Sequence, residues 1–92
     1  MKRIIYKIFT HFGLFCQKNE YWVHIKDIEI DKLMDKRISE MEYHYELSYW
    51  MEHGEFRTHI ILDKNFVLKK GYINYLIAEE YGVKLIPVFF EN

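Results

Sequence analysis

Apolar and polar residues alternate most clearly in the last third of the chain. Two short apolar runs at 60–62 and 66–68 flank a polar triplet at 63–65, a pattern typical of a tight β-hairpin. Asp63 and Asn65 fit this turn chemistry. No third oxygen ligand lies near them in the sequence, so we do not interpret them as a metal site.

A helix and a further strand are expected after the hairpin. Every residue from 72 to 81 tolerates a helix, Gly82 stands where a left-handed C-cap is expected, and Val83 can make the accompanying apolar contact. Residues 85–90 then have the apolar character of a strand. Pro87 has no backbone N–H, which predicts either an edge strand or a position outside the hydrogen-bond ladder.

Residues 39–53 carry the best-marked helix signals in the chain. Ser39 and Glu42 have the spacing of a capping box, and Gly54 is a suitable terminator. At about 100° per residue, one arc of this helix is expected to face the sheet. That arc contains Tyr43, Leu47, Trp50 and Met51.

A second stripe on this helix combines tyrosines with acidic residues. Such side chains offer apolar contact area together with hydrogen-bonding groups, a mixture that protein interfaces favour. We interpret the stripe as a candidate partner-binding surface, with Met41 beside it. The candidate residues are Glu42, Tyr45, Glu46, Tyr49, Glu52 and His53. The alternative is that the two tyrosines pack beneath the N-terminal strands.

Shorter signals precede this helix. Alternation at 4–8 predicts a strand with one buried face, and a turn at 10–13 leads to 14–16, where a returning strand can begin. Residues 21–30 predict a further strand region. Its inward-facing parity changes near residues 26–27, which predicts a bulge or a bend.

Several positions after the hairpin resemble the core box of the ParB/sulfiredoxin-like superfamily in order and spacing. The matching residues are Gly71, Tyr75, Ala78, Gly82, Ile86, Pro87 and Val88. The resemblance extends more loosely over 22–90, and it implies an α+β fold with a small mixed sheet and two main helices. We therefore expect a single domain over 1–92, in which 1–20 is an N-terminal strand extension of a core at 21–92.

Two departures from the family pattern bear on activity. The His-Arg or Arg-Arg pair that handles phosphates in nucleotide-using members of the family falls on Ile73 and Asn74, and sulfiredoxin's catalytic cysteine falls on Tyr72. The resemblance thus implies the fold without the catalysis, and we predict no catalytic residue and no cofactor. Ile73 is expected to be largely buried against 66–68, with the ancestral pocket partly filled by side chains.

The start of the second helix is still a candidate anion site. Unpaired backbone N–H groups and the helix dipole favour negative charge there, and two lysines come directly before it. The candidate phosphate ligands are Lys69, Lys70, Gly71, Tyr72 and Asn74. Asn74 lacks the charge and the two-pronged geometry of arginine, so nucleotide affinity should be weak. The alternative is an ordinary solvated helix start.

Composition narrows the classes of function. The 92 residues are 50% hydrophobic and 18% aromatic, which predicts a folded globule, and the net charge of −1 gives no support for a sequence-independent grip on nucleic acid. Cys16 is the single cysteine, so no internal disulfide is expected and a cytoplasmic location follows by default. The five histidines have no zinc-site spacing, and no segment is long enough to span a membrane.

Three functions follow from these observations. The first is a non-catalytic interaction or regulatory module that binds a protein or a protein–nucleic acid partner. The resemblance implies its context, because a chain of this size with this box is similar to accessory proteins of bacteria, phages and mobile elements, and an inhibitor is one version of that role. The second is a weak nucleotide or phosphate-ester binder, or a residual enzyme, that uses the start of the second helix. The third, a DNA-binding partition-like protein, is disfavoured because the sequence reaches Asn92 before any helix-turn-helix region. The oligomeric state stays open.

Overall fold

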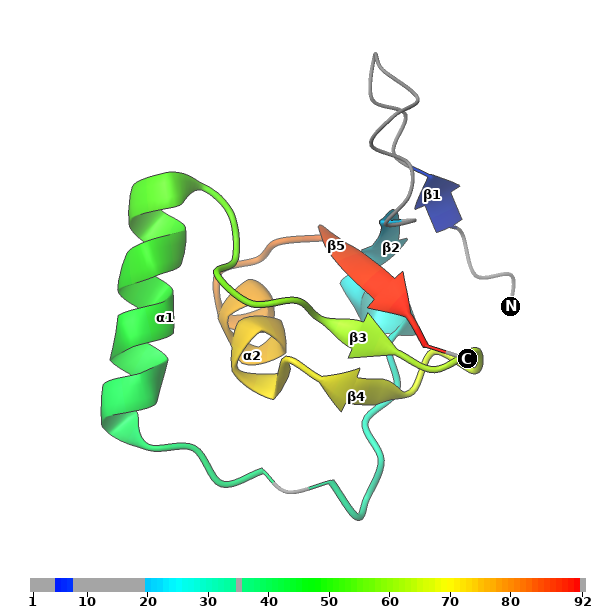
Figure 1. Cartoon of the computed structure of the whole chain (residues 1–92), viewed down its shortest axis with the longest axis horizontal. Helices are drawn as coiled ribbons and strands as arrows, with labels where there is room; N and C mark the ends of the chain where they lie inside the picture. The colour runs from blue at the N-terminus through cyan, green and yellow to red at the C-terminus, as the bar shows by residue number, and fades with distance from the viewer. Residues whose placement is uncertain (1–4, 8–19, 35, 92) are drawn as a thin grey trace.

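The computed structural model describes the backbone of residues 5–7 and all of residues 20–34 and 36–91 (Figure 1). The turn expected at 10–13, the returning strand expected at 14–16, and Cys16 lie outside these described residues. Among the residues that are described, no helix is long and apolar enough to cross a membrane.

The described strands form one mixed sheet in the order β1-β2-β5-β3-β4. Its members are β1 (Ile5–Lys7), β2 (Tyr21–His24), β3 (Ile61–Leu62), β4 (Leu68–Lys70) and β5 (Leu85–Phe90). β3 and β5 run parallel, whereas the other neighbours pair antiparallel. With the helices α1 (Glu40–His53) and α2 (Tyr72–Glu80), this architecture confirms the predicted α+β class.

The buried core lies between α2 and the sheet. Ile77 and Ala78 on α2 have no exposed surface, and Ala78 belongs to the same apolar cluster as side chains of the central strands. The core also contains Val23, Ile28, Ile60, Leu62, Phe66, Leu68, Ile86 and Val88. Burial of this apolar area is the dominant stabilising contribution in a fold of this size.

Helix α1 packs on α2 and not on the sheet, as its place beside α2 in Figure 1 shows. Tyr43 donates a hydrogen bond to Glu80, and the Trp50 ring meets the Tyr81 ring edge-on at 5.6 Å. The predicted inner arc is therefore half-buried, but against α2. The prediction was wrong for Met51, whose residue surface is 60% exposed.

Capping signals in the sequence set the helix boundaries. The Ser39 side chain accepts a hydrogen bond from the Glu42 N–H at 3.0 Å, which confirms Ser39 as the N-cap. The Glu42 carboxylate accepts from the Ser39 hydroxyl, whereas a complete capping box would have it accept from the Ser39 backbone N–H. Gly54 ends α1 in the left-handed conformation. Gly82 has φ +71°, and the Val83 N–H donates to the Ala78 carbonyl at 2.9 Å, as expected for the C-cap of α2.

The hairpin between β3 and β4 forms as predicted. One carboxylate oxygen of Asp63 accepts hydrogen bonds from the N–H groups of Asn65 and Val67 at 2.8 and 3.0 Å. The Val67 bond, followed by the Asn65 bond and the nearby lysines, lowers the pKa of Asp63 below its ordinary value. Turn chemistry thus explains this polar triplet.

Strand β5 is central, so the prediction of an edge strand was wrong. β2 pairs with it on one side and β3 on the other. Pro87 pairs in register with Trp22 of β2, so the position is within the sheet and only the side toward β3 is unpaired there. β3 begins to pair at Phe89, whose N–H donates to the Ile60 carbonyl. Residues two apart on a strand direct their N–H groups to the same side. The backbone nitrogen of Pro87 therefore points, like that of Phe89, toward the β3 side of β5, where no strand pairs at this position and no N–H is needed.

The predicted change of parity in 21–30 also occurs. A 3-10 turn, η2 (Ile25–Asp27), follows β2, so that Val23 before the turn and Ile28 after it both enter the core. Glu29 then forms an isolated parallel bridge with Val67. The bend predicted near 26–27 is thus a tight helical turn.

Candidate functional site

Two hollows lie on either side of the loop at 54–59, which joins α1 to the start of β3. Thr58 lines both of them. We call the hollow at the start of α2 the basic pocket and the one beside β5 the aromatic groove.

The basic pocket, of about 400 Å³, contains every residue of the predicted phosphate site. The structure therefore brings that set together, with Ile73, Arg37, Glu42 and Glu46 also in the wall. Whether it suits an anion depends on what each side chain is already bonded to.

Asn74 is a structural tether within this pocket. It is 1% exposed, and its side-chain amide donates to the backbone carbonyl and to the hydroxyl of Thr58, each at 2.9 Å. These bonds fasten α2 to the 54–59 loop, so the amide protons are not available to a ligand. The Asn74 side-chain oxygen is also buried, and it has no hydrogen-bond partner among the described residues.

Ile73 is only half-buried, which contradicts the expectation that it is largely buried. The physical reason is the phase of the helix. Asn74 lies on the same face of α2 as the fully buried Ile77 and Ala78, three and four residues on, and Ile73 is one position out of phase with that face. The position that carries a phosphate-handling residue in the family pattern is thus filled by a buried amide.

Gly71 is required by packing. Its φ is +94°, and a Cβ at this position would lie 2.9 Å from the Cα of Ile60. Only glycine allows this close approach between the start of α2 and the strand beside it. The glycine in the motif therefore has a structural explanation that needs no ligand.

Nearby carboxylates partly neutralise the positive charges of the basic pocket. The Lys69 ammonium lies 3.8 Å from the Asp63 carboxylate, and the pocket wall includes the carboxylates of Glu42 and Glu46. One oxygen of Glu46 is buried without a hydrogen-bond partner among the described residues, like that of Asn74. Buried acceptor oxygens oppose an anion, so this pocket is weakly suited to phosphate.

The acidic and tyrosine-rich stripe of α1 does not form one continuous surface. Glu46 is 7% exposed, and the Arg57 guanidinium donates to one of its oxygens, with the Nε atom at 3.0 Å. The same guanidinium lies over the Tyr45 ring, 5.1 Å from its centroid. Glu46 is therefore occupied in holding α1 to the loop, contrary to the solvent-facing position expected for it.

The other members of the stripe are divided between different surroundings. Glu42 lies at the helix N-terminus and lines the basic pocket, whereas Tyr49 lines the aromatic groove. Glu52 and His53 are exposed at the end of α1, where the His53 ring lies 4.1 Å from the Tyr49 ring. Of the six candidates, Tyr49 contributes to the larger hollow.

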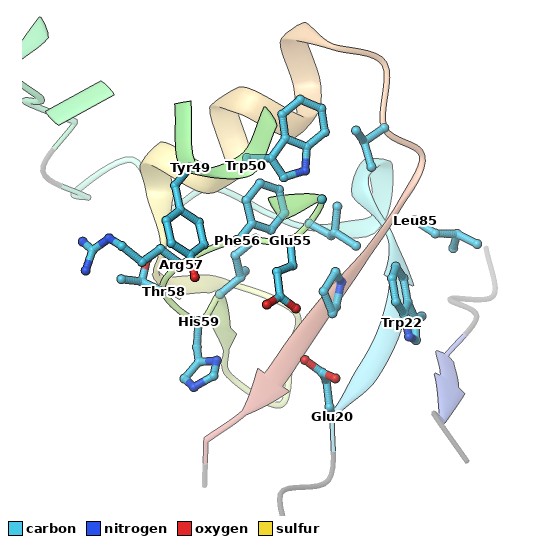
Figure 2. A pocket seen from close by; sticks show the side chains of 15 residues that line it. Glu20, Trp22, Tyr49, Trp50, Glu55, Phe56, Arg57, Thr58, His59 and Leu85 are labelled. Atoms are coloured by element: carbon cyan, nitrogen blue, oxygen red, sulfur yellow. The ribbon is translucent and has the colours of Figure 1, made fainter. Parts of the chain in front are cut away.

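The aromatic groove, of about 610 Å³, runs beside β5 (Figure 2). One wall comes from the end of α1 and the 54–59 loop, where the Trp50 and Phe56 rings stack with centroids 6.1 Å apart. The opposite wall is formed by Trp22 of the neighbouring strand β2 and by Leu85 at the start of β5. Both are exposed at more than a third of their surface.

The groove exists because β3 leaves the first half of β5 uncovered. β3 pairs with β5 at Phe89 and Phe90, while the chain that precedes β3 forms the 54–59 loop. Pro87 lines the groove at this uncovered side. A proline there removes a backbone donor and so discourages another strand from pairing with β5.

Sequence reasoning missed most of the groove. Trp22 alternates with the buried Val23, and Leu85 and Pro87 alternate with the buried Ile86, so each strand carries the signal of an outward face. The register that places Trp22 opposite Pro87 depends on long-range pairing of β2 with β5. No local pattern reports that pairing.

The described residues contain no group of three His, Cys, Asp or Glu side chains that could hold a metal ion. The described histidines are therefore not assembled into a ligand set.

The mixed sheet with its two helices defines the class as a small α+β domain. Among solved structures, the chain is similar to one entitled "Structure of the C2221 form of Pnob8-like ParB-N domain", with a TM-score of 0.65 and 22% identity. The similarity covers 77% of this chain and 28% of that chain, and it confirms the ParB-like fold. No protein-family model matches the sequence. No curated protein matches it either.

Proposed function

We propose that this protein is a non-catalytic interaction module that binds a protein partner, alone or within a protein–nucleic acid complex, through the aromatic groove. The observation that carries the proposal is the groove itself, because its apolar wall residues remain accessible. Trp22 and Leu85 are both partly exposed beside a concave surface. Clustered aromatic side chains with a polar rim are typical of surfaces that bind other proteins.

The basic pocket supports the same proposal, because its residues are better explained by folding than by ligand binding. Gly71, which matches the family pattern, and Asn74, which stands where that pattern has an arginine, are both explained by packing. A ParB-like fold without its phosphate-handling pair is consistent with an accessory or regulatory role, including one in a partition or mobile-element system. An inhibitor of a nucleic-acid-binding partner is one form that this role can take.

Selection from a random library of capped heptapeptides, with the full chain immobilised, tests the groove. We expect the selected peptides to lose about tenfold in affinity for Trp22→Ala, as hot-spot residues do. Leu33→Ala is the matched control, because Leu33 is 92% exposed and lines neither hollow. No enriched peptide, or enriched peptides that bind Trp22→Ala as well as the unchanged chain, would overturn the proposal.

A second candidate function is weak binding of a nucleotide or another phosphate ester at the start of α2. The observation in its favour is that one pocket gathers the whole predicted set, with Lys70 exposed at its edge. Lys70 is the cation that this function needs most, because Lys69 already lies near Asp63. The buried acceptor oxygens described above limit the affinity.

Isothermal titration with ATP, CTP and their diphosphates tests this second function. It requires saturable binding that weakens on Lys70→Ala and not on Lys64→Ala, because Lys64 is an exposed lysine of the hairpin turn outside the pocket. Absent binding, or binding that both substitutions change equally, would remove it. Salt-dependent binding of duplex DNA would instead revive the partition-like hypothesis.

A further inference from the structure

Two carboxylates stand at the rim of the aromatic groove. Glu20 precedes β2 and Glu55 lies on the 54–59 loop, and Figure 2 shows both carboxylates directed toward β5 from different sides. Neither forms a salt bridge with a lysine or arginine of the described residues.

The one arginine in the groove wall does not offset these charges. Arg57 is bonded to the buried Glu46, and this pair is neutral as a unit. The groove therefore combines aromatic walls with an excess of negative charge. An anionic ligand such as a nucleic-acid strand would bring its phosphates toward Glu20 and Glu55, which disfavours base stacking in this groove despite the tryptophans.

A cationic side chain fits this combination. Lysine and arginine have apolar stems that cover aromatic surface, and their charged ends are attracted both to aromatic faces and to carboxylates. Pro87 discourages recognition by strand addition, so the contacts that remain are those of side chains. The stacked rings of Trp50 and Phe56 and the ring of Trp22 supply the aromatic surface.

We propose that the aromatic groove selects a lysine or arginine side chain carried on an otherwise apolar segment of the partner protein, with Glu20 and Glu55 as the residues that recognise the charge. This inference rests on the proposed function, because it names the chemistry of the segment that the groove accepts. The aromatic residues supply affinity, and the two carboxylates supply the choice of charge.

The test uses the same full chain and the capped heptapeptide library. We expect lysine and arginine to be enriched in the selected peptides relative to the input library. The best peptide is then synthesised with citrulline, a neutral analogue of arginine, or with norleucine in place of lysine. Each replacement should weaken binding about tenfold, and the peptide affinity should fall as salt is raised.

The double substitution Glu20→Gln with Glu55→Gln should remove most of the difference between the basic peptide and its neutral analogue. Glu40→Gln is the control, because Glu40 is exposed on α1 and does not line the groove. In peptides without tryptophan, quenching or a shift of protein fluorescence reports the groove, since both tryptophans of the sequence line it. Melting temperatures of all variants confirm that they are folded.

The outcomes separate the inference from the function on which it rests. If peptides are enriched and depend on Trp22 but show no preference for lysine or arginine, the inference fails and the proposed function stands. If the double glutamine variant keeps the full preference for basic peptides, the inference also fails. If no peptide is enriched, both fail. Preferred binding of an oligothymidylate at the tryptophans would likewise contradict both.

Discussion

The basic pocket and the aromatic groove both reach Thr58 of the 54–59 loop, yet they differ in which side chains are free to bind a ligand. In the basic pocket, Asn74 is bonded to Thr58 and Glu46 to Arg57. In the groove, Trp22 and Leu85 keep accessible surface. Polar side chains of the basic pocket are therefore used for folding, while apolar side chains of the groove remain available for binding.

The difference has an energetic basis. A buried polar side chain stabilises a fold only if its hydrogen bonds are satisfied, so the two bonds from Asn74 make it costly to replace. Apolar side chains at a concave surface contribute little to folding where they remain solvated, and they gain free energy when a partner covers them. Stability measurements should therefore respond to changes in the basic pocket, and binding measurements to changes in the groove.

The largest effect is expected for restoring the family pair as Ile73→His with Asn74→Arg. The arginine would place a charge where the fold now buries an amide, and we expect the free energy of unfolding to fall by about 3 kcal/mol or more. Urea denaturation measures this loss. Ile73→His alone is the control and should cost much less, because Ile73 is half-buried. Equal stability of the double variant and the unchanged chain would show that position 74 is an open site.

Truncation to alanine should also destabilise the protein more at Asn74 than at Ile73. Asn74→Ala removes both bonds to Thr58, and we expect it to lower the free energy of unfolding by about 2–3 kcal/mol. Ile73→Ala should cost about 1 kcal/mol, because part of its side chain is already exposed. Denaturant midpoints for both variants test the order. A larger cost at Ile73 than at Asn74 would contradict the assignment of the buried face of α2.

Ser39→Ala tests whether peptide binding at the groove changes when helix α1 is destabilised at a distant position. Loss of the cap should lower the free energy of unfolding by about 1 kcal/mol, because the Glu42 N–H loses its acceptor. Ser39 lines neither hollow, so peptide binding at the groove should not change. Urea denaturation and the peptide titration are compared on one preparation. A parallel loss of stability and peptide affinity would mean that the groove variants report folding.

The smallest effect concerns the contact between α1 and α2 at high pH. The hydrogen bond to Glu80, and then burial, raise the pKa of Tyr43 from 10.0 to about 12. A raised pKa in the folded state means that the stabilisation is fully present below pH 10 and is lost as the pH rises to about 12. The stability difference between the unchanged chain and Tyr43→Phe should therefore be constant up to about pH 10 and then shrink. Denaturant titrations across that range check this window, and a difference that persists at pH 12 would contradict it.

Local signals in the sequence were sufficient for the two helices, their ends and the hairpin turn, but not for the exact strand boundaries. The capping residues Ser39, Gly54 and Gly82 and the turn at 63–65 all act through neighbours a few residues away, so their effects could be predicted. Together with the spacing of the ParB-like box, they led to the correct fold.

The sites depended on contacts that local patterns do not report. The burial of Glu46 follows from Arg57, eleven positions along the chain, and the burial of Asn74 follows from Thr58, sixteen positions away. The central position of β5 follows from its pairing with β2 at the other end of the sequence. For these reasons the candidate surface on α1 was placed incorrectly at Glu46, and the groove was not foreseen.

The most direct test of the central claim is a nuclear magnetic resonance titration of the labelled full chain with the best basic heptapeptide, and in parallel with CTP. The indole N–H signals of Trp22 and Trp50 report the groove, and the backbone amides of Gly71 and Tyr72 report the basic pocket. We predict that the peptide shifts both indole signals and leaves the two amides unchanged, and that CTP shifts neither pair strongly. Saturable shifts of Gly71 and Tyr72 with CTP, with the indole signals unmoved by any peptide, would contradict the account.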